Sequence, residues 1–161
     1  MWVFKLSENK LISKVAELLA AQKIVAWFQG KMEFGARALG NRSILASPMK
    51  PEMREKLNYV VKKREGFRPF APSVLEEEAN TFFKLKEPVP HMNQVVKAKV
   101  NFLPAATHID GTCRVQTVTK EQNRKYWNLI EEVGRLTKVP VLLNTSFNLK
   151  DQTITLSLIH I

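Results

Sequence analysis

The sequence predicts a mixed α/β (α+β) domain, and three observations lead to this prediction. Two long segments carry apolar residues at helical spacing, while several shorter runs are apolar throughout or alternate as strands do. Turn residues separate these runs without the regular strand–helix–strand order of a parallel sheet. The chain has 161 residues, of which 45% are apolar, so residues 1–161 suffice for a single domain with a sizeable core.

An amphipathic helix and a short strand are expected first. Residues 7–21 begin at the candidate N-cap Ser7 and place five apolar residues on one helical stripe: Leu11, Ile12, Val15, Leu18 and Leu19. Residues 23–30 have the pattern of a buried strand that ends at Gly30. Residues 31–47 mix small, basic and apolar residues without a clean period, which predicts a structured loop with a helical turn.

A second helix and an extended segment are expected next. Residues 51–63 begin with a proline, as helices often do, and should turn four residues inward: Met53, Leu57, Val60 and Val61. Residues 67–75 contain two prolines, and because a residue before proline avoids the helical region, this segment should be extended. Residues 76–83 predict a short helix.

The second half is expected to contain further strands and the clearest helix. Residues 93–102 alternate well enough for a strand, and residues 106–119 indicate two strands joined by a tight Asp-Gly turn. Residues 120–138 predict the helix, with one apolar side: Tyr126, Leu129, Ile130, Val133 and Leu136. Residues 139–148 are an apolar strand that runs into a polar turn.

The formal net charge of +10 indicates anionic partners. The charge is concentrated in residues 31–75, where ten basic residues face four acidic ones, an excess of six. Composition alone leaves nucleic acid, phosphorylated metabolites and anionic membrane surfaces open as partners.

Cys113 is the only cysteine, so an intramolecular disulfide is excluded. There is no leader pattern and no apolar run near the ~20 residues needed to span a bilayer, so we expect a cytoplasmic protein. Residues 149–161 end in an apolar run without a closing helix. We therefore expect a domain fragment that is truncated after about residue 150.

The stretch GARALGNRS (residues 35–43) begins with the glycine spacing of a phosphate-binding P-loop. The Lys and the directly following Ser or Thr of that motif are missing, which excludes a Walker nucleotide site. Arg37, Arg42 and Ser43 still lie near glycines that let backbone amides approach an anion. A helix-capping loop with solvent-facing arginines explains the same residues, and both interpretations stay open.

Residues 62–72 combine cations with a stiffened backbone. Lys62, Lys63, Arg64 and Arg68 lie beside two prolines. A solvated surface needs charge without stiffness, so this pairing suggests cations that are held in place for an anion. Cations also favour a helix C-terminus, which suffices to explain Lys63. Arg68 lies beyond the expected helix, and anion binding is the better interpretation there.

The segment around the Asp-Gly turn carries polar residues on both sides. Thr107 and His108 precede the turn, and Arg114 shares one face of the following strand with Gln116. That face can equally be a solvent-exposed one. The three histidines of the chain have no spacing typical of a zinc or iron site, so we expect no metal site.

The last predicted strand ends in Asn144, Thr145, Ser146 and Asn148, which can present amides and hydroxyls to a ligand or form an ordinary turn. Ser146 lacks the G-x-S-x-G elbow, so a catalytic triad is poorly supported. Taken together, the polar stretches predict a cleft for a phosphorylated small molecule.

Four segments in order give the chain a resemblance to a known family. They are GKMEFGARALGNRSILASP, NYVVKKREGFRPFAPSVL, PAATHIDGTCRVQTV and PVLLNTSFN. From about residue 23 to residue 148, the chain resembles the C-terminal domain of the nodulation-type and antibiotic-tailoring O-carbamoyltransferases. The resemblance implies a YrdC-like twisted mixed sheet with flanking helices and a concave basic face.

The resemblance also implies an enzyme, a transferase domain that makes carbamoyl adenylate from ATP, with Mg²⁺, and carbamoyl phosphate. In such proteins a separate N-terminal Kae1-like domain binds a metal and passes the carbamoyl group to an acceptor hydroxyl. That domain is absent from this sequence, so it is an implied partner within one longer polypeptide. No metal ligand and no membrane partner are expected in residues 1–161.

The resemblance assigns roles to individual positions. Four cations are expected to carry the chemistry around the phosphates: Lys62, Arg68, Arg37 and Arg114. Nine further residues are expected to contact or support the nucleotide: Met92, Asn144, Thr145, Ser146, Arg42, Ser43, Arg64, Thr107 and His108. Met92 is expected beside the base, and the polar turn at Asn144 and Ser146 is expected to face the adenylate phosphate.

Two other readings remain open. YrdC-like folds are also linked to tRNA modification, so a basic RNA-binding module is an alternative, with Phe67 and Phe70 as candidate stacking residues beside Arg68. The chain can also be an inactive fragment that needs its partner domain to complete the cleft.

Overall fold

The computed structural model describes residues 4–157 of the chain. A five-stranded sheet has the strand order β1-β2-β7-β3-β6. Its strands are β1 (Val25–Phe28), β2 (Arg42–Ala46), β3 (Ala71–Leu75), β6 (Gln116–Val118) and β7 (Val141–Ser146). A separate two-stranded ladder joins β4 (Val96–Lys97) to β5 (Thr112–Cys113). The helical elements are α1 (Glu8–Ala20), α2 (Glu52–Lys56), η1 (Leu57–Lys62), η2 (Glu76–Glu78), α3 (Ala79–Phe82) and α4 (Arg124–Thr137).

The sheet topology brings polar strand ends together. β3 and β6 are parallel, and β7 runs antiparallel to β3, so the end of β7 lies beside the start of β3. Asn144 of β7 is paired with Ala71, and Ser73 of β3 is paired with Gln116, the first residue of β6. The polar turn after β7 therefore lies at the same edge of the sheet as the segments that lead into β3 and β6.

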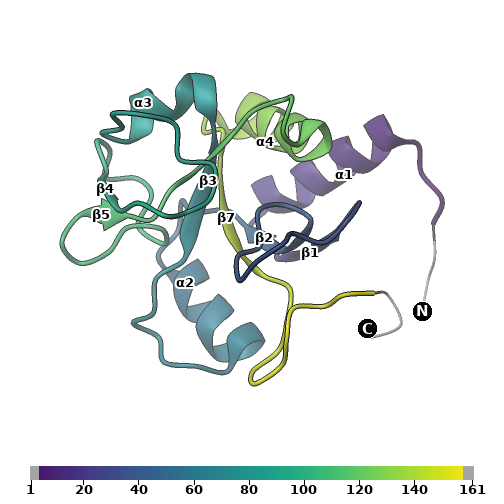
Figure 1. Cartoon of the computed structure of the whole chain (residues 1–161), viewed down its shortest axis with the longest axis horizontal. Coiled ribbons are helices and arrows are strands. Elements are labelled where there is room, and N and C mark those ends of the chain that lie inside the picture. Colours follow the sequence, from purple (N-terminus) through teal and green to yellow (C-terminus); the bar gives the residue numbers. More distant parts are fainter. Residues whose placement is uncertain (1–3, 158–161) are drawn as a thin grey trace.

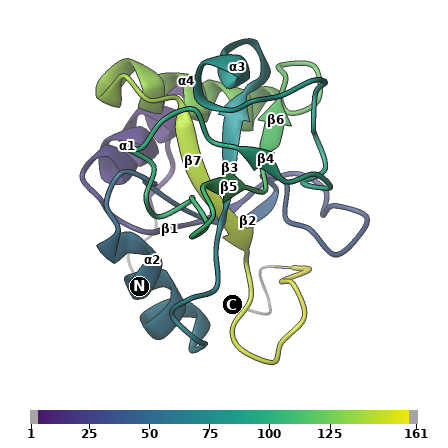
Figure 2. The same ribbon diagram turned by 90° about the vertical axis from the view of Figure 1, so that its left-hand side faces the viewer.

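Helices cover both faces of this sheet (Figure 1). On one face, α1 and α4 pack against each other and against inward side chains such as Leu45 and Leu142. On the other face, α2, α3 and the loops around β4 and β5 cover Ile44 and Leu143. Figure 2, turned toward this second face, shows the β4–β5 ladder in front of β3 and β7. Because both faces are covered, β2 is buried along its whole length and β7 along its first four residues, rather than at alternate positions.

The mixed α/β class is confirmed, and each predicted helix is present. The main error lies in residues 31–47, where the fully buried strand β2 replaces part of the expected loop. The error arises at Arg42, because a cation at the start of a buried strand obscures the apolar pattern of that strand. The structure accommodates this cation by stacking its guanidinium on Phe28, 3.5 Å from the ring centre. The strand expected in residues 93–102 shrinks to Val96–Lys97, and the strand expected directly before the Asp-Gly turn, in residues 106–109, does not form.

The predicted helix faces are correct near their centres and wrong at their margins. Leu11, Leu18 and Leu136 are exposed by 37%, 37% and 40%, because each lies at the edge of its apolar stripe. Val60 is 67% exposed for a different reason. The α-helix changes into a π-helical turn at η1, and this turn rotates the residues that follow relative to an α-helical register.

Two further features follow from the described residues alone. No helix within residues 4–157 has both the length and the apolar character that a membrane span requires. Within the same residues, His, Cys, Asp and Glu form no group of three or more that could hold a metal ion.

Candidate functional site

Cationic side chains from four parts of the chain meet at the end of β7, around two adjoining cavities. We call the smaller one, of about 120 Å³, the inner cavity, and the larger one, of about 270 Å³, the outer cavity. The polar and charged residues of the inner cavity, together with Met92, are Arg37, Arg64, Arg114, Asn144, Thr145 and Ser146. Those of the outer cavity are Lys62, Lys63, Arg64, Glu65, Arg68, Ser146, Asn148, Lys150 and Asp151. Arg64 and Ser146 line both cavities, so the two form one continuous site.

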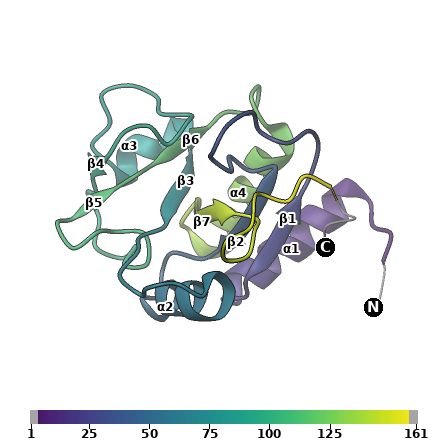
Figure 3. The same ribbon diagram turned by 60° about the horizontal axis from the view of Figure 1, so that its bottom comes forward.

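Lys62 connects η1 to the turn after β7. Its side chain is buried, and its ammonium donates to the Ser146 carbonyl and, at 3.1 and 2.8 Å, to the carbonyl and side-chain oxygens of Asn148. The Ser146 hydroxyl lies 3.3 Å away. All of these partners are neutral. Burial first, and the charge of Arg64 second, lower the pKa of Lys62 to about 8. Figure 3 shows the segment after β7, in yellow, lying beside the end of this helix.

Asn58, a fully buried residue of η1, organises the loop that carries Arg64 and Arg68. Its side-chain nitrogen donates to the carbonyls of Gly66 and Arg68, at 3.1 and 2.9 Å, and its side-chain oxygen accepts from Arg64 Nε at 2.7 Å. The Arg64 guanidinium also stacks on Phe70, 4.8 Å from the ring centre. The stiffness inferred from the two prolines of this loop is therefore reinforced by one buried amide.

Arg114 and Arg37 reach the inner cavity from two other segments of the chain. Arg114 is half-buried, and its Nε is shielded from solvent without a hydrogen-bond partner. Burial first, and Arg37 second, lower the pKa of Arg114. Burial, Arg68 and Arg114 likewise lower the pKa of Arg64, with Glu65 acting in the opposite direction. Cations that destabilise one another in this way favour an anion between them.

Arg68 lies at the rim of the outer cavity rather than at its centre. Its side chain is 52% exposed, and its Nε is 2.9 Å from Glu65 Oε2. An exposed ion pair of this kind contributes little to stability, so Arg68 can exchange Glu65 for a ligand at low cost.

Arg42 and Ser43, predicted near the nucleotide, are not among the residues that line either cavity. The Arg42 guanidinium donates to the carbonyls of Gln29, Gly30 and Leu156. The Ser43 hydroxyl accepts from the Gly40 amide at 3.1 Å and is fully buried. The structure places both residues in the frame of the loop that carries Arg37.

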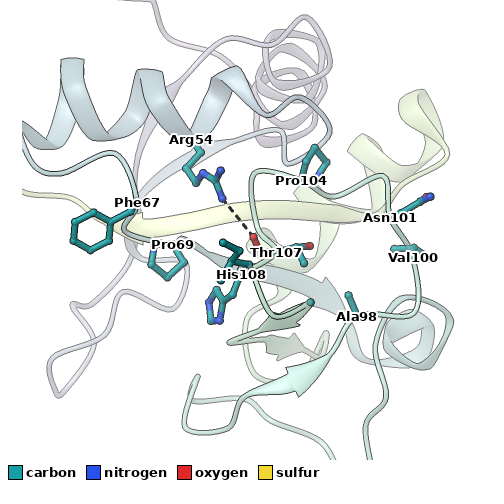
Figure 4. Close-up of a pocket in the computed structure, with 11 residues that line it drawn as sticks. Arg54, Phe67, Pro69, Ala98, Val100, Asn101, Pro104, Thr107 and His108 are labelled. Carbon is teal, nitrogen blue, oxygen red and sulfur yellow. Dashed lines mark hydrogen bonds between the residues drawn. The ribbon is translucent and has the colours of Figure 1, made fainter.

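Thr107 and His108 line a third cavity, of about 840 Å³, which is the largest of the three (Figure 4). Its walls are mainly apolar, and Pro69 also lines the inner cavity. The Thr107 carbonyl lies 3.5 Å from the Arg54 guanidinium, and His108 Nδ1 lies 2.9 Å from the Thr112 hydroxyl. The cationic residues thus surround the two small cavities, while the largest hollow lies beside them.

The structure therefore brings most of the predicted residues together: Lys62, Arg64, Arg68, Arg37, Arg114, Met92, Asn144, Thr145 and Ser146. Two asparagines that organise this site, Asn58 and Asn148, were not among the residues predicted to contact the nucleotide. A buried Asn58 on an apolar helix face was the available signal for the first. Asn148 lies in the quoted polar turn, but only its contact with Lys62 distinguishes it.

Comparisons with known proteins identify the family to which the chain is similar. A family model described as carbamoyltransferase C-terminus matches residues 16–159. Nodulation protein NolNO of Sinorhizobium fredii is 53% identical over 146 residues, which cover 87% of this chain and 22% of the relative. Nodulation protein NolO of Bradyrhizobium diazoefficiens is 50% identical over 146 residues, which cover 87% of this chain and 27% of the relative. The chain thus spans about a quarter of the length of these relatives.

A solved structure shares the fold. The crystal structure of full-length HypF in the phosphate- and nucleotide-bound form matches 89% of this chain and 21% of the HypF chain, with a TM-score of 0.63 and 21% sequence identity. This likeness supports the mixed α/β architecture predicted from the sequence.

Proposed function

The chain belongs to the carbamoyltransferase C-terminus family, and we propose that it forms carbamoyl adenylate from ATP and carbamoyl phosphate. The carbamoyl group would then pass to an acceptor hydroxyl at a site outside these residues. The relatives are about four times longer than this chain, so there is room for such a partner domain within one polypeptide.

The excess of unpaired cations is the observation that carries the proposal. Within residues 4–157, Lys62, Arg37, Arg64 and Arg114 make no salt bridge, although they surround adjoining cavities. Lys62 is buried, Arg64 and Arg114 are half-buried, and Arg37 is exposed. The desolvated cations among them are costly without a counter-charge unless a ligand supplies the negative charge. Phosphate groups suit this arrangement, because arginine forks bind their oxygens in pairs.

The proposed reaction needs such a site because its reactants repel one another. Hydrolysis of carbamoyl phosphate releases inorganic phosphate and carbamate. A carbamate oxygen then attacks the α-phosphorus of ATP, the bond to the bridging oxygen breaks, and pyrophosphate leaves. The cations hold these anions in line and stabilise the charge that develops on the α-phosphoryl oxygens.

A magnesium ion is implied by the use of ATP. The outer cavity is lined by two carboxylates, Glu65 and Asp151. That set fits, since Mg²⁺ usually takes one or two protein carboxylates in addition to substrate phosphates. When bound, the ion would neutralise part of the triphosphate charge.

Replacing Arg68 with alanine is expected to weaken ATP–magnesium binding by more than tenfold, or about 1.4 kcal/mol. The loss follows because Arg68 faces the outer cavity and is held by only one exposed carboxylate. Isothermal titration with and without carbamoyl phosphate measures it. Arg135→Ala is the matched variant and should leave binding unchanged, because Arg135 forms the same kind of exposed ion pair, with Glu132, outside both cavities. Wild-type affinity in Arg68→Ala would argue strongly against the proposed site.

Anion affinity is expected to fall by about tenfold between pH 7 and pH 9. Lys62, with a pKa of about 8, is charged below this pH and neutral above it. A bound anion favours the charged form, so binding takes up a proton as the pH rises through 8. Sulfate is the suitable probe, because its own charge is constant over this range. Lys62→Met should bind sulfate weakly at every pH, and a flat wild-type profile would contradict the role of Lys62.

Binding titrations also distinguish the proposed enzyme from the two alternatives, an RNA-binding module and an inactive fragment. Of the two candidate stacking residues, Phe70 is buried beneath Arg64, whereas Phe67 is 79% exposed and available to stack on an RNA base. Salt-dependent binding of an RNA oligomer that ATP does not diminish would favour the RNA-binding module. Absence of ATP binding to well-folded protein would indicate a fragment that needs its partner domain.

A further inference from the structure

The Asn144 side chain has a fixed orientation at the floor of the inner cavity. The residue is only 2% exposed. Its side-chain nitrogen donates to Ala38 O at 3.1 Å, Ser73 Oγ at 3.2 Å and Gln116 Oε1 at 3.0 Å. Gln116 is itself fixed, since its nitrogen donates to the Leu39 carbonyl at 2.9 Å. Rotating the Asn144 amide by half a turn would place its oxygen against two acceptor oxygens, so the observed orientation is the one that the contacts allow.

This orientation leaves the Asn144 oxygen, Oδ1, without a partner. The atom is buried, and no group within residues 4–157 donates a hydrogen bond to it. A buried unpaired acceptor is costly, and in native proteins it calls for an explanation such as a bound ligand. The cations of the inner cavity, Arg37, Arg64 and Arg114, offer only donors. A ligand that satisfies the whole cavity therefore needs an anionic group for the arginines and an N–H or O–H donor for Asn144.

We infer that Asn144 determines specificity by accepting a hydrogen bond from the amide nitrogen of the carbamoyl group. This inference rests on the proposed function. Carbamoyl phosphate combines a phosphate anion with an NH₂ donor, whereas the phosphates of ATP carry no donor at neutral pH. Acetyl phosphate is nearly the same size and charge, but it places a methyl group where carbamoyl phosphate has NH₂. Asn144 Oδ1 is thus the atom that distinguishes the two.

The discrimination should be substantial because the acceptor is buried. A site built to hydrogen-bond an N–H group rejects an analogue that lacks it, since the buried oxygen stays unpaired. One such hydrogen bond corresponds to a preference of about tenfold to a hundredfold.

The test compares two stable anions that differ only at this position, phosphonoacetamide and 2-oxopropylphosphonate, with inorganic phosphate as the baseline. Isothermal titration of the wild-type chain should show a preference of at least about tenfold for the amide. In Asn144→Ala the two affinities should become equal within about threefold. Arg37→Ala is the control, because loss of a cation should weaken both anions and keep their ratio.

Each outcome has a distinct meaning. If the wild-type chain binds phosphonoacetamide and 2-oxopropylphosphonate with equal affinity, the inference is overturned, but the anion site stands. A preference for the amide that persists in a folded Asn144→Ala variant has the same meaning. If Asn144→Ala does not fold, the wild-type ratio alone decides. Failure of all three anions, inorganic phosphate included, to bind folded wild type overturns the proposed function itself.

Discussion

Replacing Arg114 with alanine is expected to weaken ATP–magnesium binding by about a hundredfold without loss of the fold. Arg114 faces the inner cavity with a buried Nε that has no partner, so its donors are available to a phosphate. Two charge-assisted hydrogen bonds of about 1.5 kcal/mol each amount to about this loss. The free energy of unfolding should stay the same or rise, because the change also removes a desolvated cation that repels Arg37.

The combination of weaker binding and undiminished stability is what identifies a binding residue. Isothermal titration and urea unfolding measure the two quantities. Arg135→Ala is the matched control, since Arg135 is exposed on α4 and paired with Glu132, outside both cavities. An Arg114→Ala variant that binds ATP within twofold of wild type, or one that unfolds, would contradict the role assigned to Arg114.

Replacing Gly40 with alanine is expected to lower the free energy of unfolding by about 3 kcal/mol. Gly40 has a φ of +110°, which is strained for any residue with a Cβ atom. The added Cβ would also lie 2.3 Å from Cδ1 of the Tyr126 ring, which is fully buried in α4 and unable to withdraw. Backbone strain and overpacking each cost about 1–3 kcal/mol, so the sum is a large part of the stability of a small domain.

Gly35→Ala separates the two causes. Gly35 has a φ of +135°, but an added Cβ meets nothing within 4 Å. Only the backbone strain remains, and the expected cost is about 1 kcal/mol. Urea unfolding of both variants gives the comparison. Equal costs at the two positions would show that contact with Tyr126 is not what confines Gly40.

The sequence shows which residues could bind an anion, but it does not show which other residues each of them contacts. Arg37, Arg64 and Arg114 lie in three separate segments, and the resemblance was what placed them together before the structure did. Arg42 was indistinguishable from them by type, yet it stacks on Phe28 and binds backbone carbonyls. What separates Arg42 from the arginines that line the inner cavity is that its two terminal guanidinium nitrogens already donate to backbone carbonyls, and a linear pattern does not encode that.

In the fold, too, elements with a continuous apolar pattern could be predicted, and elements that depend on tertiary contacts could not. The helix of residues 120–138 and the strand of residues 139–148 could be predicted because each buries one continuous set of apolar residues. Strand β2 could not, since its first residue is a buried cation that only the tertiary structure compensates. The role of Asn58 was similarly hidden, because its carbonyl partners in the loop are defined only after that loop has folded.

The π-helical turn at η1 has a consequence for the spacing of residues along the chain. A π-turn accommodates one more residue than an α-turn, so the backbone rotates less per residue between Leu57 and Lys62 than it would in an α-helix. If the same residues wound as an unbroken α-helix, Lys62 would be rotated by roughly 100°, away from Asn148. Deleting one exposed residue, Tyr59 or Val60, would let the segment close into an α-helix and keep Lys62 on the side of Asn148, because the tighter winding offsets the missing residue. The winding of the helix, and not only residue identity, is therefore part of the anion-binding motif in this segment.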